Sequence, residues 1–240
     1  MRVILRWAMG AGLIVVCGTA AAAQSAGEAA SWSALMMTPY GALPLLVSPG
    51  MAGLSAFEIE LGTSLEARFG RWSRDEQAWN NFGVGGRGEH FGIAVGYSEC
   101  EGCEEGAIMA AVDYEWVLAK PSEDVPLSLT SFVVTLRPAG GFAMSTGEGT
   151  ASATSLAVDL PVSLPIPVGA ESRIAAFISP GFGYGRFSVD TDDPRGGIRP
   201  SLAAGIAFVA PGALGFHLAW RKIFIEDGPG MFGLGVTYGG

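Results

Sequence analysis

Charged residues, cysteine and histidine are scarce in this sequence. Only 15% of its 240 residues are charged, and it contains 3 cysteines and 2 histidines. Its 14 Lys and Arg residues are outnumbered by 23 Asp and Glu, which argues against nucleic acid as a partner, because neutralising phosphates requires clustered basic side chains. Hydrophobic residues make up 49% and glycine occupies 36 positions, a composition that favours one domain with a continuous core or membrane face.

Long uninterrupted apolar runs are also rare, and the clear one lies at the N-terminus. Arg2 and Arg6 precede an apolar stretch to Val16, and small residues follow up to Ala23. This pattern predicts a secretory signal peptide over residues 1–23. Cys17 raises the alternative of a lipoprotein, but such sites prefer a small residue just before the cysteine.

No transmembrane helix is expected after the signal. The longest later apolar stretch, residues 41–57, is interrupted by two prolines and two glycines and makes a poor spanning helix. We expect residues 24–54 to form a poorly ordered periplasmic segment and residues 55–240 to form the folded domain. Cys100 and Cys103 then remain as an even pair in an oxidising compartment, which predicts a disulfide.

Alternation with a period of two dominates the remaining sequence and predicts an all-β domain. In FEIELGTSLEARF, residues 57–69, apolar or small residues occupy the odd positions, and the charges occupy even ones. We expect about ten strands, with a range of 8–12. Besides 57–69, similar stretches lie at 80–88, 90–98, 107–120, 131–144, 154–164, 172–187, 199–210, 213–222 and 230–240.

Strand length separates a membrane barrel from a soluble sandwich. A 13-residue strand is ~40 Å long, and a tilt of ~40° lets it cover the ~30 Å of a bilayer core. Sandwich strands are usually about half as long. The faces opposite the apolar residues carry paired charges and glycines, which suits a narrow polar lumen. The sequence therefore predicts a closed antiparallel up-and-down transmembrane β-barrel.

The segments between strands alternate in character. RGEH, AKPSEDVP, PIPVGAES and PGA are expected as turns at one end, and the more acidic WSRDEQAW, ECEGCEEG, STGEGT, VDTDDPRGG and EDGPG as loops at the other. Aromatic residues near strand ends are expected in interfacial girdles: Trp72, Trp79, Tyr97, Trp116, Trp220 and Tyr238. Four prolines fall within proposed strands and imply bulges, bends or shorter strands: Pro138, Pro161, Pro180 and Pro200.

The strand series from Phe57 to Tyr238, the phrase LPVSLPIPVGAESRIAAFISPGFGYGRF and the glycine-rich last strand resemble the small bacterial outer-membrane β-barrels, such as the barrels of outer membrane proteins A and X. The resemblance covers residues 55–240 and is architectural. It implies the bacterial outer membrane as location, with lipid, lipopolysaccharide and the barrel assembly machinery as partners. Members of that group end in an aromatic residue, whereas here Tyr238 is followed by Gly239 and Gly240.

The same alternation assigns charges to the lumen. A buried unpaired charge is costly, so the near balance of the two signs predicts an ion-pair network that fills the barrel. Its predicted members are Glu58, Glu60, Glu66, Arg68, Asp113, Glu115, Arg137, Asp159, Arg173, Arg199 and Arg221.

Motifs that suggest other chemistry have plainer explanations. The CEGC segment around Cys100 and Cys103 is flanked by glutamates that disfavour a reactive thiolate, and zinc requires two further ligands. GFGYGR and FGVGGRG lack the helix that a phosphate loop requires. DTDD, residues 190–193, lacks the ligand spacing of a calcium loop. His217 suggests a lipid-modifying enzyme, but no serine nucleophile lies close in the sequence.

These observations favour a non-enzymatic outer-membrane barrel with a structural, adhesive or surface-protective role, without a cofactor. Two alternatives stay open: a narrow passive pore for small solutes and a lipid-modifying enzyme. A barrel of 8–10 strands leaves room mostly for side chains, whereas open porins have ~16 or more. The sequence does not indicate a ligand or an oligomeric state.

Overall fold

The described part of the chain is a single antiparallel β-sheet. The computed structural model describes residues 64–74, 77–88, 90–101, 106–119, 132–146, 151–168, 172–189, 195–211, 214–224 and 230–239. Among these residues no helix is long and apolar enough to cross a membrane. The predicted signal peptide, the segment 24–54, and the DTDD motif lie outside the described residues.

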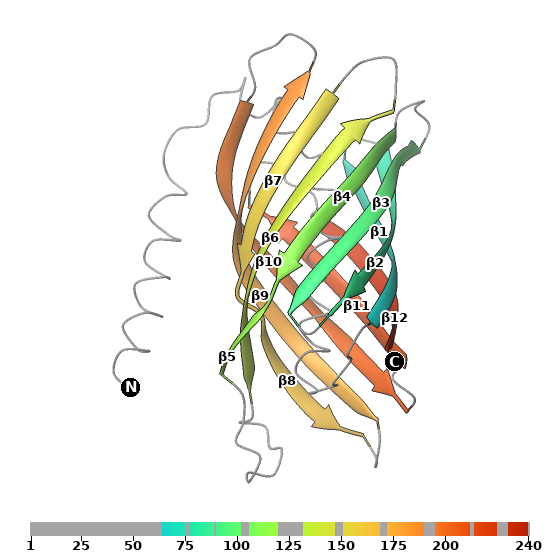
Figure 1. The fold of residues 1–240 in the computed structure, drawn as a ribbon, viewed down its shortest axis with the longest axis vertical. Helices are drawn as coiled ribbons and strands as arrows, with labels where there is room; N and C mark the ends of the chain where they lie inside the picture. The colour runs from blue at the N-terminus through green and yellow to red at the C-terminus, as the bar shows by residue number, and fades with distance from the viewer. Residues whose placement is uncertain are drawn as a thin grey trace, which may run out of the picture.

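Twelve strand segments follow one another in these ranges (Figure 1). Their bounds are β1 Ser64–Arg74, β2 Gln77–Arg87, β3 Phe91–Glu101, β4 Gly106–Tyr114, β5 Trp116–Ala119, β6 Val133–Ser145, β7 Ala151–Asp159, β8 Val162–Pro167, β9 Arg173–Val189, β10 Arg195–Ala210, β11 Leu214–Ile223 and β12 Gly230–Gly239. β5 continues β4 against β6 after a break at Glu115, and β8 continues β7 against β9. The described segments therefore make ten spanning strands.

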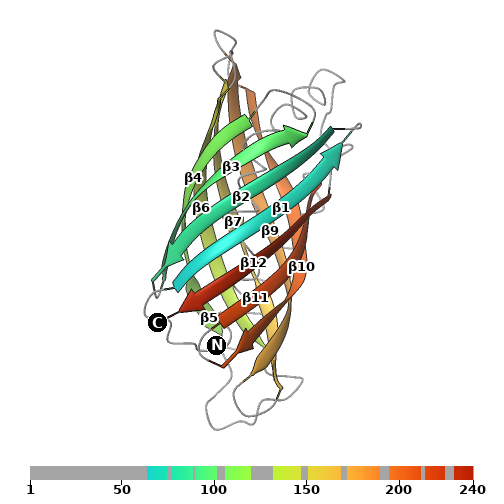
Figure 2. The ribbon, with the colours of Figure 1, turned by 90° about the vertical axis from the view of Figure 1, so that its right-hand side faces the viewer.

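The sheet closes on itself. β1 pairs with β2 on one side and with β12 on the other, from Ser64↔Gly239 to Trp72↔Met231 (Figure 2). Closure gives each spanning strand two neighbours, which is the condition for crossing a bilayer with strands. The prediction of a closed antiparallel transmembrane barrel of about ten strands is confirmed.

The stagger between strands sets the width and tilt of the barrel. The row of paired residues that starts at Arg68 can be followed around the barrel in both directions until it reaches β10. Through Gly235 and His217 it arrives at Ala207, whereas in the other direction it arrives at Arg195. The two endpoints are 12 positions apart (207 − 195). A stagger of this size in ten strands corresponds to a tilt of about 40°, and it leaves a lumen wider than that of an eight-stranded barrel.

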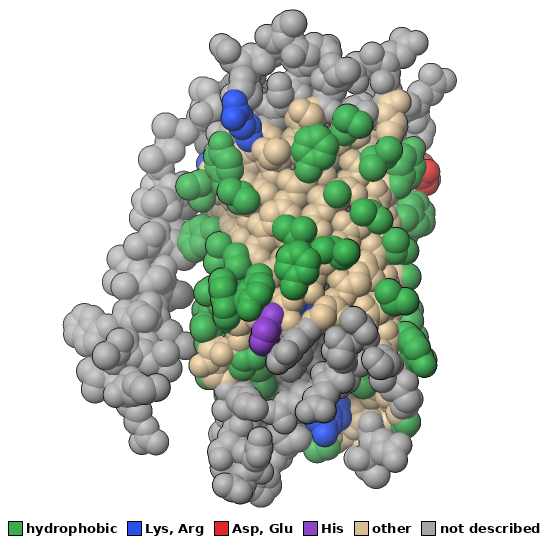
Figure 3. Space-filling model, viewed as in Figure 1, with side chains coloured by type: hydrophobic (Ala, Val, Ile, Leu, Met, Phe, Trp, Pro, Cys, Tyr) green, Lys and Arg blue, Asp and Glu red, His purple; other side chains and the backbone are tan. Residues whose placement is uncertain are grey.

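The outer face carries the apolar side chains. Leu65 is 71% exposed and Ile93 55%, and large hydrophobic side chains are distributed over the outer surface in Figure 3. Tyr97, Trp116 and Tyr238 are exposed as girdle residues should be. So much exposed apolar surface is unusual on a soluble monomer and fits a surface that contacts lipid.

Several boundaries differ from the predicted ones. β1 is described from Ser64, and it continues to Arg74, which pairs with Gln77; the predicted loop WSRDEQAW is therefore mostly strand. Trp79 was expected at an interface, but its side chain is buried on the lumen side, because its position has the same parity as Asn81. RGEH is also shorter as a turn than predicted, because Arg87 belongs to β2.

The four prolines behave in two ways. Pro161 lies in the break between β7 and β8, as a residue without an N–H group should, and its carbonyl accepts the Thr135 N–H at 3.0 Å. Pro138, Pro180 and Pro200 instead remain at regular ladder positions inside β6, β9 and β10. The wall from β6 to β10 therefore lacks several N–H donors that an ordinary sheet would supply.

Candidate functional site

The inner face of the barrel combines small side chains with buried charges. Four carboxylates and four arginines of the inner face form ion pairs with one another: Glu66, Asp113, Glu115, Asp159, Arg68, Arg87, Arg137 and Arg221. They form three groups, which we name after their central carboxylates. Equal numbers of the two signs are what pairing in a low-dielectric interior requires.

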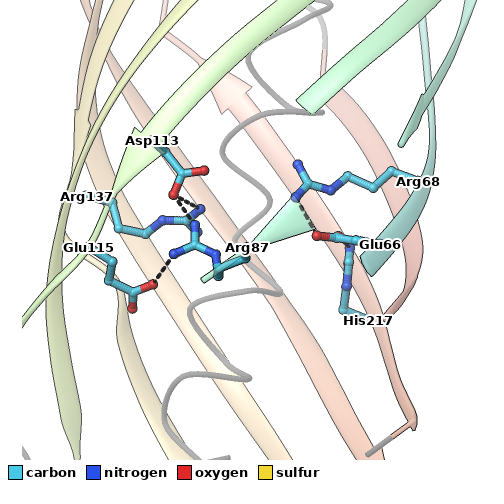
Figure 4. A network of polar contacts seen from close by, with 7 residues as sticks. All are labelled: Glu66, Arg68, Arg87, Asp113, Glu115, Arg137 and His217. Carbon is cyan, nitrogen blue, oxygen red and sulfur yellow. Dashed lines mark hydrogen bonds and ion pairs between the residues drawn. The ribbon is translucent and has the colours of Figure 1, made fainter. Parts of the chain in front are cut away.

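The Asp113 cluster consists of Arg87, Asp113, Glu115 and Arg137 (Figure 4). Asp113 Oδ1 accepts hydrogen bonds from Arg87 Nη2 and from Arg137 Nη2, the latter at 3.0 Å. Arg87 Nη1 donates to Glu115 Oε2 at 3.1 Å. Arg137 has no exposed surface. On the inner face of the wall, the cluster therefore links Arg87 of β2 and Arg137 of β6 to Asp113 of β4 and to Glu115, which follows β4.

Gly92 of β3 makes this arrangement possible. Arg87, Gly92 and Asp113 occupy one ladder row across β2, β3 and β4, so the arginine must reach over β3 to meet the aspartate. A Cβ atom at position 92 would lie 2.5 Å from Asp113 Oδ2 and 3.1 Å from Arg87 Nη2. A larger residue here would therefore displace one of the two charged side chains, which glycine lets approach each other over β3.

The Asp159 cluster consists of Asp159, Ser201 and Arg221. Arg221 forms a bidentate pair with Asp159, with Nη2 3.0 Å from Oδ1 and Nη1 3.2 Å from Oδ2, and it also donates to Ser201 Oγ at 2.8 Å. The pair connects β11 to β7 across β9 and β10, the wall in which prolines remove ladder donors. A Cβ atom at Gly181 of β9 would overlap the Asp159 carboxylate.

The Glu66 cluster consists of Glu66, Arg68 and His217. Arg68 Nη2 pairs with Glu66 Oε2, and His217 Nε2 lies 3.4 Å from Glu66 Oε1 (Figure 4). A glycine again separates the partners, because Gly235 of β12 lies between His217 and Arg68 in the ladder and a Cβ there would overlap the imidazole ring. In the Asp113 and Asp159 clusters the ion pairs thus cross a glycine of an intervening strand, whereas in the Glu66 cluster the ion pair lies within β1 and the contact to His217 crosses Gly235.

The other predicted network residues lie apart from these clusters. Arg199 is half-buried and donates to its neighbour's carbonyl, Ile198 O, at 3.0 Å. Arg173 occupies a lumen-facing position but is exposed at the first residue of β9. Glu58 and Glu60 lie outside the described residues. The predicted disulfide does too, because the side chain of Cys100 and the whole of Cys103 are undescribed.

Sequence reasoning missed Arg87 as a member of the network. Glycines at 83, 85, 86 and 88 hide the alternation of β2, so Arg87 was assigned to a turn. Arg87 lies six positions from Asn81, an even number, so the two side chains point to the same face of β2. This spacing was the signal that could have placed Arg87 in the lumen. His217 was placed on the lumen side but was not included in the network.

The inner charges of the described strands pair with one another. Within the described ranges, no three His, Cys, Asp or Glu side chains are grouped as metal ligands. Each described cluster carboxylate has an arginine nitrogen within 3.1 Å, and Glu66 has in addition the contact to His217 at 3.4 Å. The arrangement holds strands together from inside the barrel.

Comparison with known proteins finds structural likeness without sequence relatives. No family model matches the chain, and no curated protein matches it in sequence. The β domain of the Bordetella autotransporter BrkA is 12% identical, with a TM-score of 0.39 over 75% of this chain and 99% of that one. The outer membrane enzyme PagL is 12% identical, with a TM-score of 0.39 over 73% and 99%. The N-terminal β-barrel domain of Pseudomonas aeruginosa OprF is 12% identical, with a TM-score of 0.32 over 73% and 95%.

Proposed function

We propose that the protein is a non-enzymatic barrel of the bacterial outer membrane with a structural, adhesive or surface-protective role. The observation that carries the proposal is the set of ion pairs that cross the inner wall. A pore that conducts ions requires a continuous aqueous path, whereas Arg137 has no exposed surface and Asp113 and Asp159 are nearly as buried. Such side chains occupy the lumen instead of lining a channel.

The outer membrane is proposed as the location on two grounds. The apolar outer face needs lipid, and the signal peptide predicted at residues 1–23 directs export. In bacteria the outer membrane is the usual location of such barrels. The end where β1 begins and β12 ends would then face the periplasm. Lipopolysaccharide and the barrel assembly machinery are the expected partners.

The absence of enzymatic activity is part of the proposal. His217, the residue that suggested lipid hydrolysis, lies beside Glu66 and close to Arg68 inside the barrel wall. A general base must reach the proton that it removes from a substrate or nucleophile. A histidine buried against this ion pair is better suited to packing and charge pairing.

Planar-bilayer recording of the refolded full chain tests the proposal. We expect weak or no conductance from the unmodified protein. Asp159→Ala, which leaves Arg221 without its bidentate partner, should give larger or more frequent conductance events. Leu156→Ala on the outer face of the same strand is the matched control and should behave as the unmodified protein. Large and steady conductance from the unmodified protein would instead support the alternative of a narrow passive pore.

A further inference from the structure

One side of the barrel has a much shorter apolar surface than the other. On β3 the outward side chains are, starting at the turn from β2, Phe91, Ile93, Val95, Tyr97, Glu99 and Glu101. The apolar run from Phe91 to Tyr97 covers six positions (97 − 91), which is about 15 Å along the barrel axis at a tilt of about 40°. The outer apolar band of a membrane barrel is usually about 25 Å tall, so β3 falls well short of it.

Both ends of this run on β3 are set by described residues. At the turn end of the barrel, where β1 begins, the N–H group of Gly88 donates to the Phe91 carbonyl at 2.8 Å and closes the turn between β2 and β3. At the opposite, loop end, Arg71 of β1 donates to Asn80 of β2 at 3.3 Å and to Glu101 of β3 at 2.7 Å. The Arg71 and Glu101 side chains are more than half exposed on the outer face, so contact with hydrocarbon must end below them.

The strands next to β3 share this short apolar surface. The large apolar side chains on the outer face of β2 are Phe82 and Val84, and on β12 the exposed apolar run extends from Phe232 to Tyr238. We call the outer surface of the adjacent strands β12, β1, β2 and β3 the short face. In Figure 2 these strands face the viewer, and the strands behind them extend past them at both ends. Tyr97 and Tyr238 lie at the ends of their runs, where interfacial tyrosines are expected.

The opposite wall carries a longer apolar surface. β10 lies five spanning strands from β3 in either direction around the barrel. Its outward side chains are apolar from Ile198 to Ala210, which is 12 positions (210 − 198) or about 30 Å along the axis. On β6 the exposed apolar side chains likewise extend from Phe132 to Met144. These runs match the thickness of a bilayer core, whereas the short face does not.

The ladder shows which residues of β3 and β10 lie at the same height. The row of paired residues through Gly92 reaches Arg199 of β10 by way of β4, β6, β7 and β9. In the other direction the row meets β10 12 positions nearer the turn end, because the stagger of the barrel has this size. The residue level with Gly92 is therefore midway, at Gly205, and Phe91 is level with Ile206.

The short run of β3 consequently ends before the run of β10 at both ends. From Ile206 the apolar surface of β10 continues to Ala210, about 10 Å further along the axis, whereas Phe91 is followed directly by the turn. At the loop end, Glu99 is level with Ile198, which is 65% exposed. Tilting the whole barrel in the membrane cannot remove a difference that has the same sense at both ends.

We propose that the short face contacts a locally thinned bilayer, whose hydrocarbon core is about 10–15 Å thinner beside β3 than beside β10. A membrane meets a short hydrophobic surface by thinning, by contact with extended polar side chains, or through association of the protein. The tight turn at Gly88 holds backbone at the turn end, and side chains cannot bridge 10 Å from there. The exposed pair of Arg71 and Glu101 suits lipid headgroups that have moved towards the middle of the barrel.

The proposal goes beyond the proposed function, because it concerns the membrane around the barrel and holds whether the lumen is closed or open. It gives the barrel one distinct side, at which the neighbouring lipids are displaced from their usual thickness. The other strands are matched to an ordinary bilayer and leave it unchanged.

The immersion depth of spin labels at level positions tests the proposal. The full chain without its native cysteines receives one new cysteine, Phe91→Cys or Ile206→Cys, and is refolded into phospholipid bilayers with a hydrocarbon core of about 30 Å. Depth is measured as protection from a water-soluble nickel complex relative to oxygen. We expect the label at position 206 to lie about 10 Å deeper than the label at position 91. Val95→Cys and Leu202→Cys, which are also level with one another, are the matched controls and should both be immersed.

The other outcomes would overturn the proposal. Equal depth at positions 91 and 206 would mean a bilayer of uniform thickness. A label at position 91 that is shielded from both reagents, with spin–spin broadening between molecules, would identify the short face as a contact between two copies of the chain. If Phe91→Cys fails to fold, as judged by heat-dependent gel mobility, Glu99→Cys and Ile198→Cys make the same comparison at the loop end, where the label at position 198 should be immersed and that at 99 should not. None of these results alters the conductance expected from the proposed function.

Discussion

Removing the Asp113 carboxylate should destabilise the barrel strongly. Asp113→Ala takes away the carboxylate that accepts hydrogen bonds from both Arg87 and Arg137, while the hydrogen bond from Arg87 to Glu115 remains. Arg137 is completely buried, so its guanidinium group cannot regain water in the folded state. Breaking a buried ion pair by removing one partner costs about 3–5 kcal/mol.

Equilibrium unfolding in urea, followed by tryptophan fluorescence in detergent or lipid, measures this loss. Val112→Ala is the matched control, because Val112 is the neighbouring residue of β4 on the exposed outer face and takes part in no charge pair. We expect Asp113→Ala to lower the free energy of unfolding by about 3–5 kcal/mol. The control should change it by much less.

A double substitution identifies the cause of the loss. Combining Asp113→Ala with Arg137→Met removes the buried cation whose carboxylate acceptor has been lost, and it should recover part of the lost stability, with a coupling of about 0.5–3 kcal/mol. The reasoning is refuted if Asp113→Ala costs no more than Val112→Ala, or if Arg137→Met adds its full cost to that of Asp113→Ala. Either result would mean that Asp113 and Arg137 do not depend on one another in the folded barrel.

Three further outcomes are expected. Gly92→Ala should lower the free energy of unfolding by about 1–3 kcal/mol, as overpacking does. Gly233→Ala is the control and should cost less, because a Cβ there meets only an ordinary contact at 3.6 Å. Equal effects of the two substitutions in urea unfolding would contradict the role of Gly92 as the point where the two charged side chains cross β3. The folded protein should resist SDS at room temperature and change its gel mobility after boiling, since a closed barrel pairs its backbone groups internally; unchanged mobility together with solubility in detergent-free buffer would argue against a membrane barrel. A membrane-impermeant maleimide should label Cys100 and Cys103 on intact cells only after reduction, and labelling without reduction would exclude the disulfide.

The class of fold was readable from the sequence because strand periodicity is a local property. Successive side chains of a strand point to opposite faces, so the alternation around Leu65 and Glu66 already separated a lipid face from an inner face. The length of the alternating stretches and their number then favoured a closed barrel of about ten strands. Strand ends were less predictable, because the pairing of β1 with β2 continues to Arg74 and Gln77, where the alternation of apolar and polar residues has already ended.

The partners of the inner charges were decided only by the tertiary structure. Parity places Asp159 and Arg221 on the inner face, but they are 62 positions apart and meet only because the stagger of the barrel brings β7 and β11 to the same level. The role of Gly92 depends in the same way on its ladder neighbours Arg87 and Asp113, which come from two different strands. Periodicity determines which face a side chain occupies, whereas register and shear, which are properties of the closed sheet, determine what it meets there.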